Sequence, residues 1–220
     1  MDRNDSDWGL AAQSGASGEE ISELYETWAA SGNYDRDVED WGYEAPERIA
    51  DLTVAALADV PGDVLDAGCG TGKVGAALKE RGVSDVVGGD FTMASVEVAR
   101  AREVYTSVDY LDLNNPLDFA DGRFAVTASA GVFSYVTDTD ATLRELLRIV
   151  QPGGSVLFTQ RTDLWTERGC DAIIARLVDA GDCAATVSDP LPYLPLHPDF
   201  GDTIGIRYVT LAKRRDGTGD

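Results

Sequence analysis

Histidine and cysteine are scarce in this 220-residue sequence, and each scarcity restricts the possible chemistry. His197 is the only histidine, so the sequence offers no histidine-based metal site and no obvious catalytic dyad. Cys69, Cys170 and Cys183 show no paired metal spacing and follow no secretory segment, which predicts reduced thiols and a cytoplasmic protein. No apolar run approaches the ~20 residues that a membrane-spanning helix needs. Metal, disulfide and membrane roles are therefore not expected.

Basic residues are also few, since 18 Lys and Arg stand against 39 Asp and Glu, for a formal net charge of −21. The acids are mostly Asp (27), and only three of the bases are Lys. A field of this sign repels phosphate backbones, so a nucleic-acid partner is not expected.

The acidic excess is dispersed along the chain and is not gathered in one tail. We hypothesise a salt-adapted host, because charge repulsion is screened within ~3 Å at 1 M salt. Unfolding in low salt that added salt reverses would support this hypothesis. A stability that stays the same from no salt to molar salt would refute it.

A glycine-rich stretch between two short apolar segments is the most informative part of the sequence. Val64 and Leu65 end a predicted buried strand, and three glycines follow at alternate positions. Residues 74–81 then have helical apolar spacing, and 86–90 reads as a second strand. Glycine allows positive φ and close approach of a ligand to the main chain, while the helix start offers unpaired N–H groups. The stretch therefore predicts a ligand-binding loop in a strand–loop–helix–strand unit.

Three kinds of cofactor use such a loop, and the side chains distinguish them. A P-loop needs glycine where Ala67 stands and Ser or Thr where Val74 stands, so that interpretation fails. A dinucleotide fingerprint does match the glycines, and Asp90 follows Gly70 by 20 residues, as a ribose-binding carboxylate would. Asp66 favours a cationic nucleoside instead, because a carboxylate repels a pyrophosphate and attracts an ammonium or sulfonium.

The run Val64 to Gly72 resembles the first motif of class I S-adenosylmethionine-dependent methyltransferases, and Gly88 to Met93 resembles their second. The resemblance implies S-adenosylmethionine as cofactor. With the strand and helix alternation, it implies a doubly wound, seven-stranded, mostly parallel α/β sheet with an antiparallel C-terminal hairpin. The implied cofactor-binding residues are Asp66, Ala67, Gly68, Cys69, Gly70, Gly72, Asp90, Phe91, Met93, Asp112, Leu113, Ser129 and Ala130.

The resemblance also implies roles for several of these residues. Asp66 and the glycine loop would hold the methionine part, and Asp90 would hold both ribose hydroxyls. Phe91 and Met93 would contact the adenine faces. Asp112 would accept from the adenine amino group, but it can equally cap the turn that precedes Pro116, and the two interpretations stay open.

Residues 1–18 are predicted to form a disordered acidic tail, 19–213 a single methyltransferase domain, and 214–220 a second tail. The segment Tyr25 to Asp37 resembles the helical lid, about 19–45 here, that many small-molecule members of the family fold over the cofactor. Its Tyr34 is the first candidate for orienting the acceptor; the others are Phe133, Tyr135 and Arg161, which follow the fourth and fifth strands. No catalytic base is assigned.

Further elements follow from apolar periodicity and turn residues. We predict strands at 104–111, 124–129, 155–160, 184–188 and 205–212. We predict helices at 47–58, at 92–102 and from 138. The connecting segments are a turn at 151–154, a loop at 161–169 before a helix to 180, and a stiff proline-rich loop at 189–200. Segments 34–35, 41–46 and 165–169 are similar to the methyltransferase-like family named after the Williams–Beuren chromosomal region.

The predicted function is methyl transfer from S-adenosylmethionine to a small-molecule acceptor, which is favoured over a protein acceptor. One alternative is a protein that binds S-adenosylmethionine or S-adenosylhomocysteine without turnover. A less favoured one is an NAD-dependent oxidoreductase, because the sequence lacks the usual proton-donor pair and its only histidine, His197, lies in the proline-rich loop.

Overall fold

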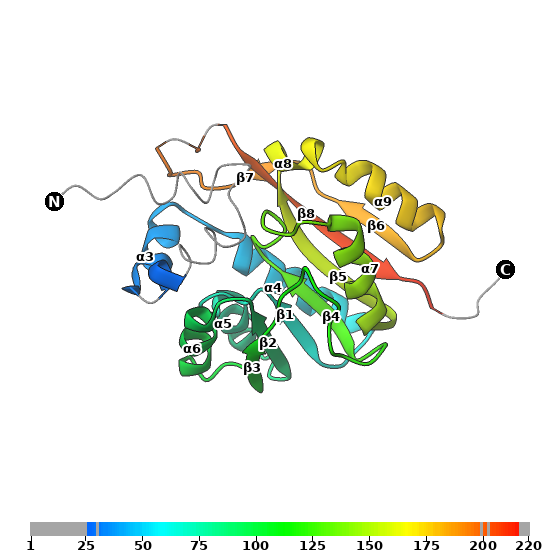
Figure 1. Cartoon of the computed structure of the whole chain (residues 1–220), viewed down its shortest axis with the longest axis horizontal. Coiled ribbons are helices and arrows are strands. Elements are labelled where there is room, and N and C mark those ends of the chain that lie inside the picture. The colour runs from blue at the N-terminus through cyan, green and yellow to red at the C-terminus, as the bar shows by residue number, and fades with distance from the viewer. Residues whose placement is uncertain (1–25, 30, 199, 202, 216–220) are drawn as a thin grey trace.

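A twisted open β-sheet forms the centre of the molecule, with helices on both of its faces (Figure 1). This computed structural model describes residues 26–29, 31–198, 200–201 and 203–215. The predicted tail 1–18, the first part of the predicted helical lid (19–25), and residues 216–220 lie outside the described residues.

The sheet has the strand order β3-β2-β1-β4-β5-β8-β6, and the short β7 pairs with β8. Strands β1 to β5 are mutually parallel, whereas β8 runs antiparallel to β5, β6 and β7. The predicted mostly parallel sheet with an antiparallel C-terminal hairpin is confirmed. The strands are β1 (Val64–Ala67), β2 (Val86–Asp90), β3 (Ser107–Tyr110), β4 (Phe124–Ser129), β5 (Val150–Arg161), β6 (Cys183–Val187), β7 (Leu191–Pro192) and β8 (Gly205–Lys213).

Helices pack on the two faces of this sheet as side-chain alternation along the strands requires. On β5, Val156 and Phe158 belong to the larger buried cluster with α7 and α9, whereas Leu157 faces the other cluster with α4 and α5. Successive side chains of this strand are thus buried on opposite faces of the sheet. The helices are α3 (Asn33–Asp40), α4 (Ala45–Asp59), α5 (Lys73–Glu80), α6 (Met93–Ala101), α7 (Thr139–Ile149), α8 (Thr162–Glu167) and α9 (Cys170–Asp179).

Three boundaries differ from the sequence prediction. Residues 151–154 are not a separate turn but an irregular part of β5, where Val150 pairs with Phe124 and Ser155 pairs with Val126. Gly153 absorbs the extra length with φ of 85°. The predicted loop 161–169 contains α8, which is short but buries Leu164 and Trp165 in the core. Packing, rather than helix propensity, stabilises so short a helix.

Strand β3 is shorter than predicted, beginning at Ser107 instead of Val104. Glu103 has a positive φ of 54° and turns the chain. Tyr105 then directs its hydroxyl to Asp66 on β1 instead of taking a place in the sheet. Tyr105, which precedes β3, therefore packs behind the glycine loop and does not extend the strand.

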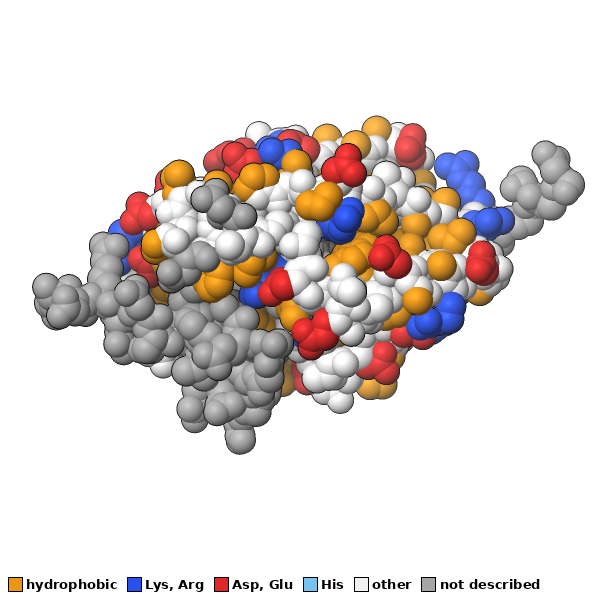
Figure 2. Space-filling model, turned by 90° about the horizontal axis from the view of Figure 1, so that it is seen from above, with side chains coloured by type: hydrophobic (Ala, Val, Ile, Leu, Met, Phe, Trp, Pro, Cys, Tyr) orange, Lys and Arg blue, Asp and Glu red, His pale blue; other side chains and the backbone are white. Residues whose placement is uncertain are grey.

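The surface carries acidic side chains in ones and twos. Figure 2 shows them dispersed over one face, interspersed with basic and apolar side chains. Many form exposed ion pairs, such as Arg48 with Glu44 and Arg100 with Asp109, which contribute little stability individually. Within the described residues, no helix is long and apolar enough to cross a bilayer.

Candidate functional site

A cavity lies beside the carboxyl ends of β1, β2 and β4, where open α/β sheets bind ligands. One wall is the glycine loop with the end of β2, and the other comes from the N-terminal segment, the loop after β4 and the chain around Tyr193. The lining residues are Ala29, Tyr34, Val38, Tyr43, Gly68, Gly70, Thr71, Asp90, Phe91, Ser95, Ala130, Gly131, Val132, Tyr135, Tyr193 and Leu194.

A second cavity adjoins the first, because the two share Gly68, Phe91, Val132 and Tyr135. Together the two cavities extend from the lid segment past the glycine loop to the chain after β3. The remaining lining residues of the second cavity are Tyr110, Leu111, Asp112, Leu113, Asn114 and Val136.

The glycine loop has a backbone conformation that glycine favours at two positions. Gly68 and Gly70 both have positive φ, of 82° and 52°. A Cβ at Gly68 would meet Val132 at 2.3 Å, whereas a Cβ at Gly70 would project into open space. The backbone at Gly70 is therefore open to approach by a ligand.

Asp90 is held rigidly at the end of β2. It is buried, and its Oδ2 accepts from the Gly70 N–H at 2.9 Å. Its Oδ1 accepts from both the N–H and the hydroxyl of Thr92, each at 3.0 Å. Burial raises the pKa of this carboxyl above its ordinary value, while these hydrogen bonds oppose the shift. The carboxyl lines the first cavity with its orientation already fixed by the loop.

Asp66 lies behind the loop and is not among the residues that line either cavity. Its Oδ2 accepts from the Tyr105 hydroxyl at 2.7 Å, and its Oδ1 has no hydrogen-bond partner among the residues that the structure describes. Complete burial raises the pKa of Asp66 to about 7, with Asp90 adding to the effect and the Tyr105 hydrogen bond opposing it. Gly75 makes room for this pair, because a Cβ there would lie 2.2 Å from the Tyr105 ring.

Asp112 caps a turn and also lines a cavity. Its carboxylate accepts from the Asn114 N–H at 2.9 Å and from the side chain of Asn115 at 2.7 Å, so it does cap the turn. It also lines the second cavity, next to Leu113. The turn cap is thus present, and the contact with adenine stays a prediction.

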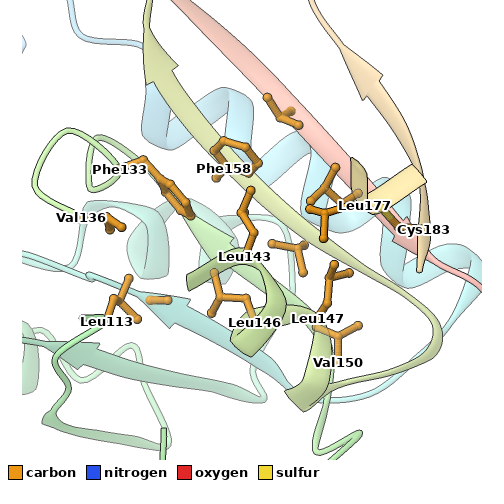
Figure 3. Packing of buried hydrophobic residues seen from close by; sticks show 14 of the residues in the cluster. Leu113, Phe133, Val136, Leu143, Leu146, Leu147, Val150, Phe158, Leu177 and Cys183 are labelled. Atoms are coloured by element: carbon orange, nitrogen blue, oxygen red, sulfur yellow. The ribbon is translucent and has the colours of Figure 1, made fainter. Parts of the chain in front are cut away.

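Several predicted site residues lie away from the cavities. Ser129 is buried and donates to the Ala67 carbonyl at 2.7 Å. Met93 is 45% exposed at the start of α6. Phe133 is fully buried and lies against Phe158, as Figure 3 shows. The centroids of the two rings are 4.4 Å apart. None of these side chains lines either cavity.

Two further predicted residues support the site from behind. Arg161 is 4% exposed and pairs with Asp163, and its guanidinium lies 5.8 Å from the ring centre of Tyr193. Cys69 is buried within the loop, and burial raises the pKa of its thiol, so it stays protonated. Packing therefore accounts for its presence in the loop.

Four tyrosines, Tyr34, Tyr43, Tyr135 and Tyr193, line the first cavity. Burial raises the pKa of Tyr34, Tyr43 and Tyr193 above the ordinary value, so their hydroxyls stay neutral. A neutral phenol can both donate and accept a hydrogen bond. The roles of Tyr43 and Tyr193 were missed from the sequence, because the proline-rich context of Tyr193 indicated only a stiff loop.

Two carboxylates connect the N-terminal segment to the cofactor side. Glu26 accepts from the Met93 and Ala94 N–H groups at 3.0 and 3.3 Å, at the start of α6. Asp35 on α3 accepts from the Thr71 hydroxyl and pairs with Arg102. Segment 26–40 therefore covers the glycine loop and is attached to it by polar contacts.

Comparisons with known proteins agree with this architecture. A family profile described as "Methyltransferase domain" matches residues 64–154. Methyltransferase-like protein 27 of Homo sapiens is 31% identical over 177 residues, which cover 78% of this chain and 71% of that protein. The chain spans 61% of the length of another curated relative and 43% of a third.

Solved structures share the fold at low identity. The [4+2]-cyclase SpnF superposes with a TM-score of 0.64 at 16% identity, covering 90% of this chain and 97% of that one. A geranyl diphosphate C-methyltransferase from Streptomyces coelicolor A3(2), solved with S-adenosyl-L-homocysteine, has a TM-score of 0.59 at 17% identity and covers 74% of each chain.

The strand order, the glycine loop and Asp90 at the end of β2 define a Rossmann-like methyltransferase fold. Its cofactor is S-adenosylmethionine. By the extent of its similarity to methyltransferase-like protein 27, the chain belongs to the class I S-adenosylmethionine-dependent methyltransferase family. The resemblance to the Williams–Beuren-region proteins agrees with this relative.

Proposed function

We propose that this protein transfers the methyl group of S-adenosylmethionine to a small-molecule acceptor in the tyrosine-lined cavity. The observation that carries the proposal is the junction of the two cavities at Gly68, Phe91, Val132 and Tyr135. A cofactor whose adenine lay in the second cavity would cross that junction and bring its methionine part into the first cavity, where Gly70 and Asp90 share the lining with the neutral tyrosine hydroxyls.

The residues that would hold the cofactor come from the glycine loop, β2 and the chain after β3. The Gly68 to Gly72 backbone would hold the methionine part. Asp90 would accept from a ribose hydroxyl through the lone pair of Oδ2 that Gly70 leaves free, since Thr92 already donates twice to Oδ1. Asp112 and Leu113 would bind the adenine edge, and Phe91 would pack on the base. Asp66 would act from behind the loop, where it is buried and accepts from the Tyr105 hydroxyl.

S-adenosylmethionine supplies an electrophilic methyl group on a sulfonium sulfur. When the methyl group is transferred, the neutral thioether that remains is a good leaving group. The protein's main tasks are then to position the acceptor and to exclude water, and effective concentration alone can contribute ~7 kcal/mol or more. Tyr34, Tyr43 and Tyr135 enclose the space in which an acceptor would lie. Tyr34 is our first choice for orienting it, since its ring can also face the sulfonium, a contact worth ~0.5 to 2 kcal/mol.

A small acceptor is supported by the tyrosine-lined cavity and by the net charge of −21, which opposes nucleic acid. The decisive experiment incubates the protein with methyl-labelled cofactor and a metabolite extract, then searches for labelled products. Asp90→Ala serves as the control. A labelled product that requires the parent protein supports the proposal. Tight cofactor binding by calorimetry without any labelled product would favour the alternative of a binding protein without turnover.

A further inference from the structure

The loop between β4 and α7 takes part in both cavities. Gly131, Val132 and Tyr135 line the first, and Val132, Tyr135 and Val136 line the second. Of these side chains, Val132 and Tyr135 lie at the junction of the cavities. A short loop of this kind lacks the regular backbone hydrogen bonds of a helix or a sheet. Contacts with other parts of the chain must therefore fix its conformation.

Arg168, at the C-terminal end of α8, supplies that fixation. Its Nη1 donates to the carbonyl oxygens of Phe133 and Val136 at 2.5 and 2.6 Å, and its Nη2 donates to that of Ser134 at 2.6 Å. Three carbonyls within four consecutive residues thus converge on one guanidinium. Tyr135 lies in the middle of this run.

These hydrogen bonds all join the Arg168 guanidinium to the 133–136 loop. Arg168 forms no ion pair with a carboxylate of the described residues, unlike Arg148 or Arg161, which each pair with an acid. Burial lowers the pKa of Arg168, although an arginine stays protonated at any ordinary pH. A half-buried charge satisfied only by backbone carbonyls stabilises the loop conformation in which those carbonyls converge.

The rest of the loop is anchored to the core. Phe133 and Val136 point into the large buried cluster, as Figure 3 shows, and Trp165 of α8 belongs to the same cluster. Gly169 follows with φ of 63° and turns the chain from α8 into α9. The Trp165 to Gly169 segment therefore places one aromatic in the core and one arginine on the loop.

We infer that Arg168 is a positioning residue that pre-forms the 133–136 loop and so holds Tyr135 at the junction of the two cavities. The rigid planar fork of an arginine holds several converging carbonyls in one fixed geometry, whereas a lysine ammonium has fewer donors on a flexible stem. Without Arg168 the loop would have to be ordered when a ligand binds, and that cost would weaken binding. The inference rests on the proposed function only in taking these cavities as the cofactor site.

The test compares Arg168→Met, Arg168→Lys and the matched control Arg176→Met, which removes an exposed arginine from α9. Calorimetry with S-adenosylhomocysteine reports affinity, and hydrogen exchange of the unliganded protein reports local opening. We expect Arg168→Met to raise the dissociation constant at least fivefold and to speed exchange of amides 133–136 at least tenfold. Arg168→Lys should recover part of the loss, and Arg176→Met should match the parent.

A double-mutant cycle identifies the residue through which Arg168 acts. If it acts through Tyr135, then Arg168→Met should cost much less affinity in a Tyr135→Ala background. Unchanged affinity in a folded Arg168→Met protein, or exchange that increases equally throughout the domain, would overturn the inference. If the parent itself does not bind S-adenosylhomocysteine, the cofactor assignment of the cavities fails instead. Should Arg168→Met not fold, Arg168→Lys with the same two measurements decides the matter.

Discussion

The glycine-loop half of the site is built from one continuous stretch, whereas the tyrosine half is assembled from three distant ones. Gly68, Thr71, Asp90 and Ser95 lie within 28 residues of each other in sequence. The four tyrosines come instead from the N-terminal segment, the loop after β4 and the proline-rich loop.

This difference suggests that the glycine-loop half is rigid, whereas the tyrosine half can vary in sequence and conformation. The glycine-loop half is braced by backbone hydrogen bonds such as Gly70 to Asp90, which leave little freedom. The tyrosine half depends on loops, which tolerate change and carry specificity. Substitutions should therefore affect cofactor binding and acceptor use separately. Asp90→Ala and Tyr34→Phe test that separation, and Asp66→Asn and Gly75→Ala test the packing that supports the glycine loop.

Asp90→Ala should have the largest effect on the glycine-loop half. Charge-assisted hydrogen bonds contribute roughly 1.5 to 3 kcal/mol, so we expect the dissociation constant for S-adenosylmethionine to rise at least tenfold by calorimetry. Circular dichroism checks that the fold persists. An unchanged affinity in the folded variant would remove Asp90 from the cofactor site.

Asp66→Asn should change stability in a pH-dependent way. The folded state holds a proton on Asp66 up to about pH 7, whereas the unfolded state releases it near the ordinary pKa of 3.8. Between these values the folded state binds more protons, so the parent loses stability as the pH rises. The stability gained by Asp66→Asn should therefore grow by on the order of 2 kcal/mol from pH 5 to pH 8.

Denaturant titrations of parent and variant at both pH values measure this difference. Asp109→Asn, which removes an exposed acid from β3, is the matched control for the loss of one carboxylate. A gain that is the same at pH 5 and pH 8 would mean that Asp66 ionises normally in the folded protein.

Gly75→Ala should destabilise the protein by about 1 kcal/mol, although alanine favours helices, because its Cβ would overlap the Tyr105 ring. Removing that ring should relieve the clash. In a Tyr105→Ala background, Gly75→Ala should therefore be neutral or stabilising in thermal unfolding. Additive losses in the double variant would show that the clash is not the cause.

Tyr34→Phe should have the smallest effect on the glycine-loop half, changing cofactor affinity by less than about threefold, or ~0.7 kcal/mol. Turnover should fall if the hydroxyl orients the acceptor. If Tyr34→Phe turns over like the parent while Tyr34→Ala loses cofactor binding, the residue is a wall of the cavity, and the acceptor is oriented from the Tyr135 side.

The sequence predicted the elements whose signals are local. Strand β4 was predicted with the observed bounds, and α7 begins after the expected Asp138, whose side chain accepts from the Ala141 N–H at 3.0 Å. Periodicity and capping lie within a few residues of each other, so one stretch suffices to recognise them. The glycine loop was found for the same reason.

The missed features depend on contacts between distant residues. Tyr105 and Asp66 are 39 residues apart, and no local pattern links them. Phe133 was a candidate for the pocket because it follows β4, but it packs into the core, whereas Tyr135 lines the cavity. Which side chain of a loop turns inward is decided by tertiary packing, to which Arg168 contributes.

The contacts of Glu26 and Asp35 have a consequence for timing. Both carboxylates attach the N-terminal segment across the glycine loop, beside the first cavity. If a ligand in that cavity leaves past α3, both contacts must break first, and the same step then slows entry and exit together. We expect release of the spent cofactor to contribute to the turnover time, as the opening of a covering segment does in many enzymes.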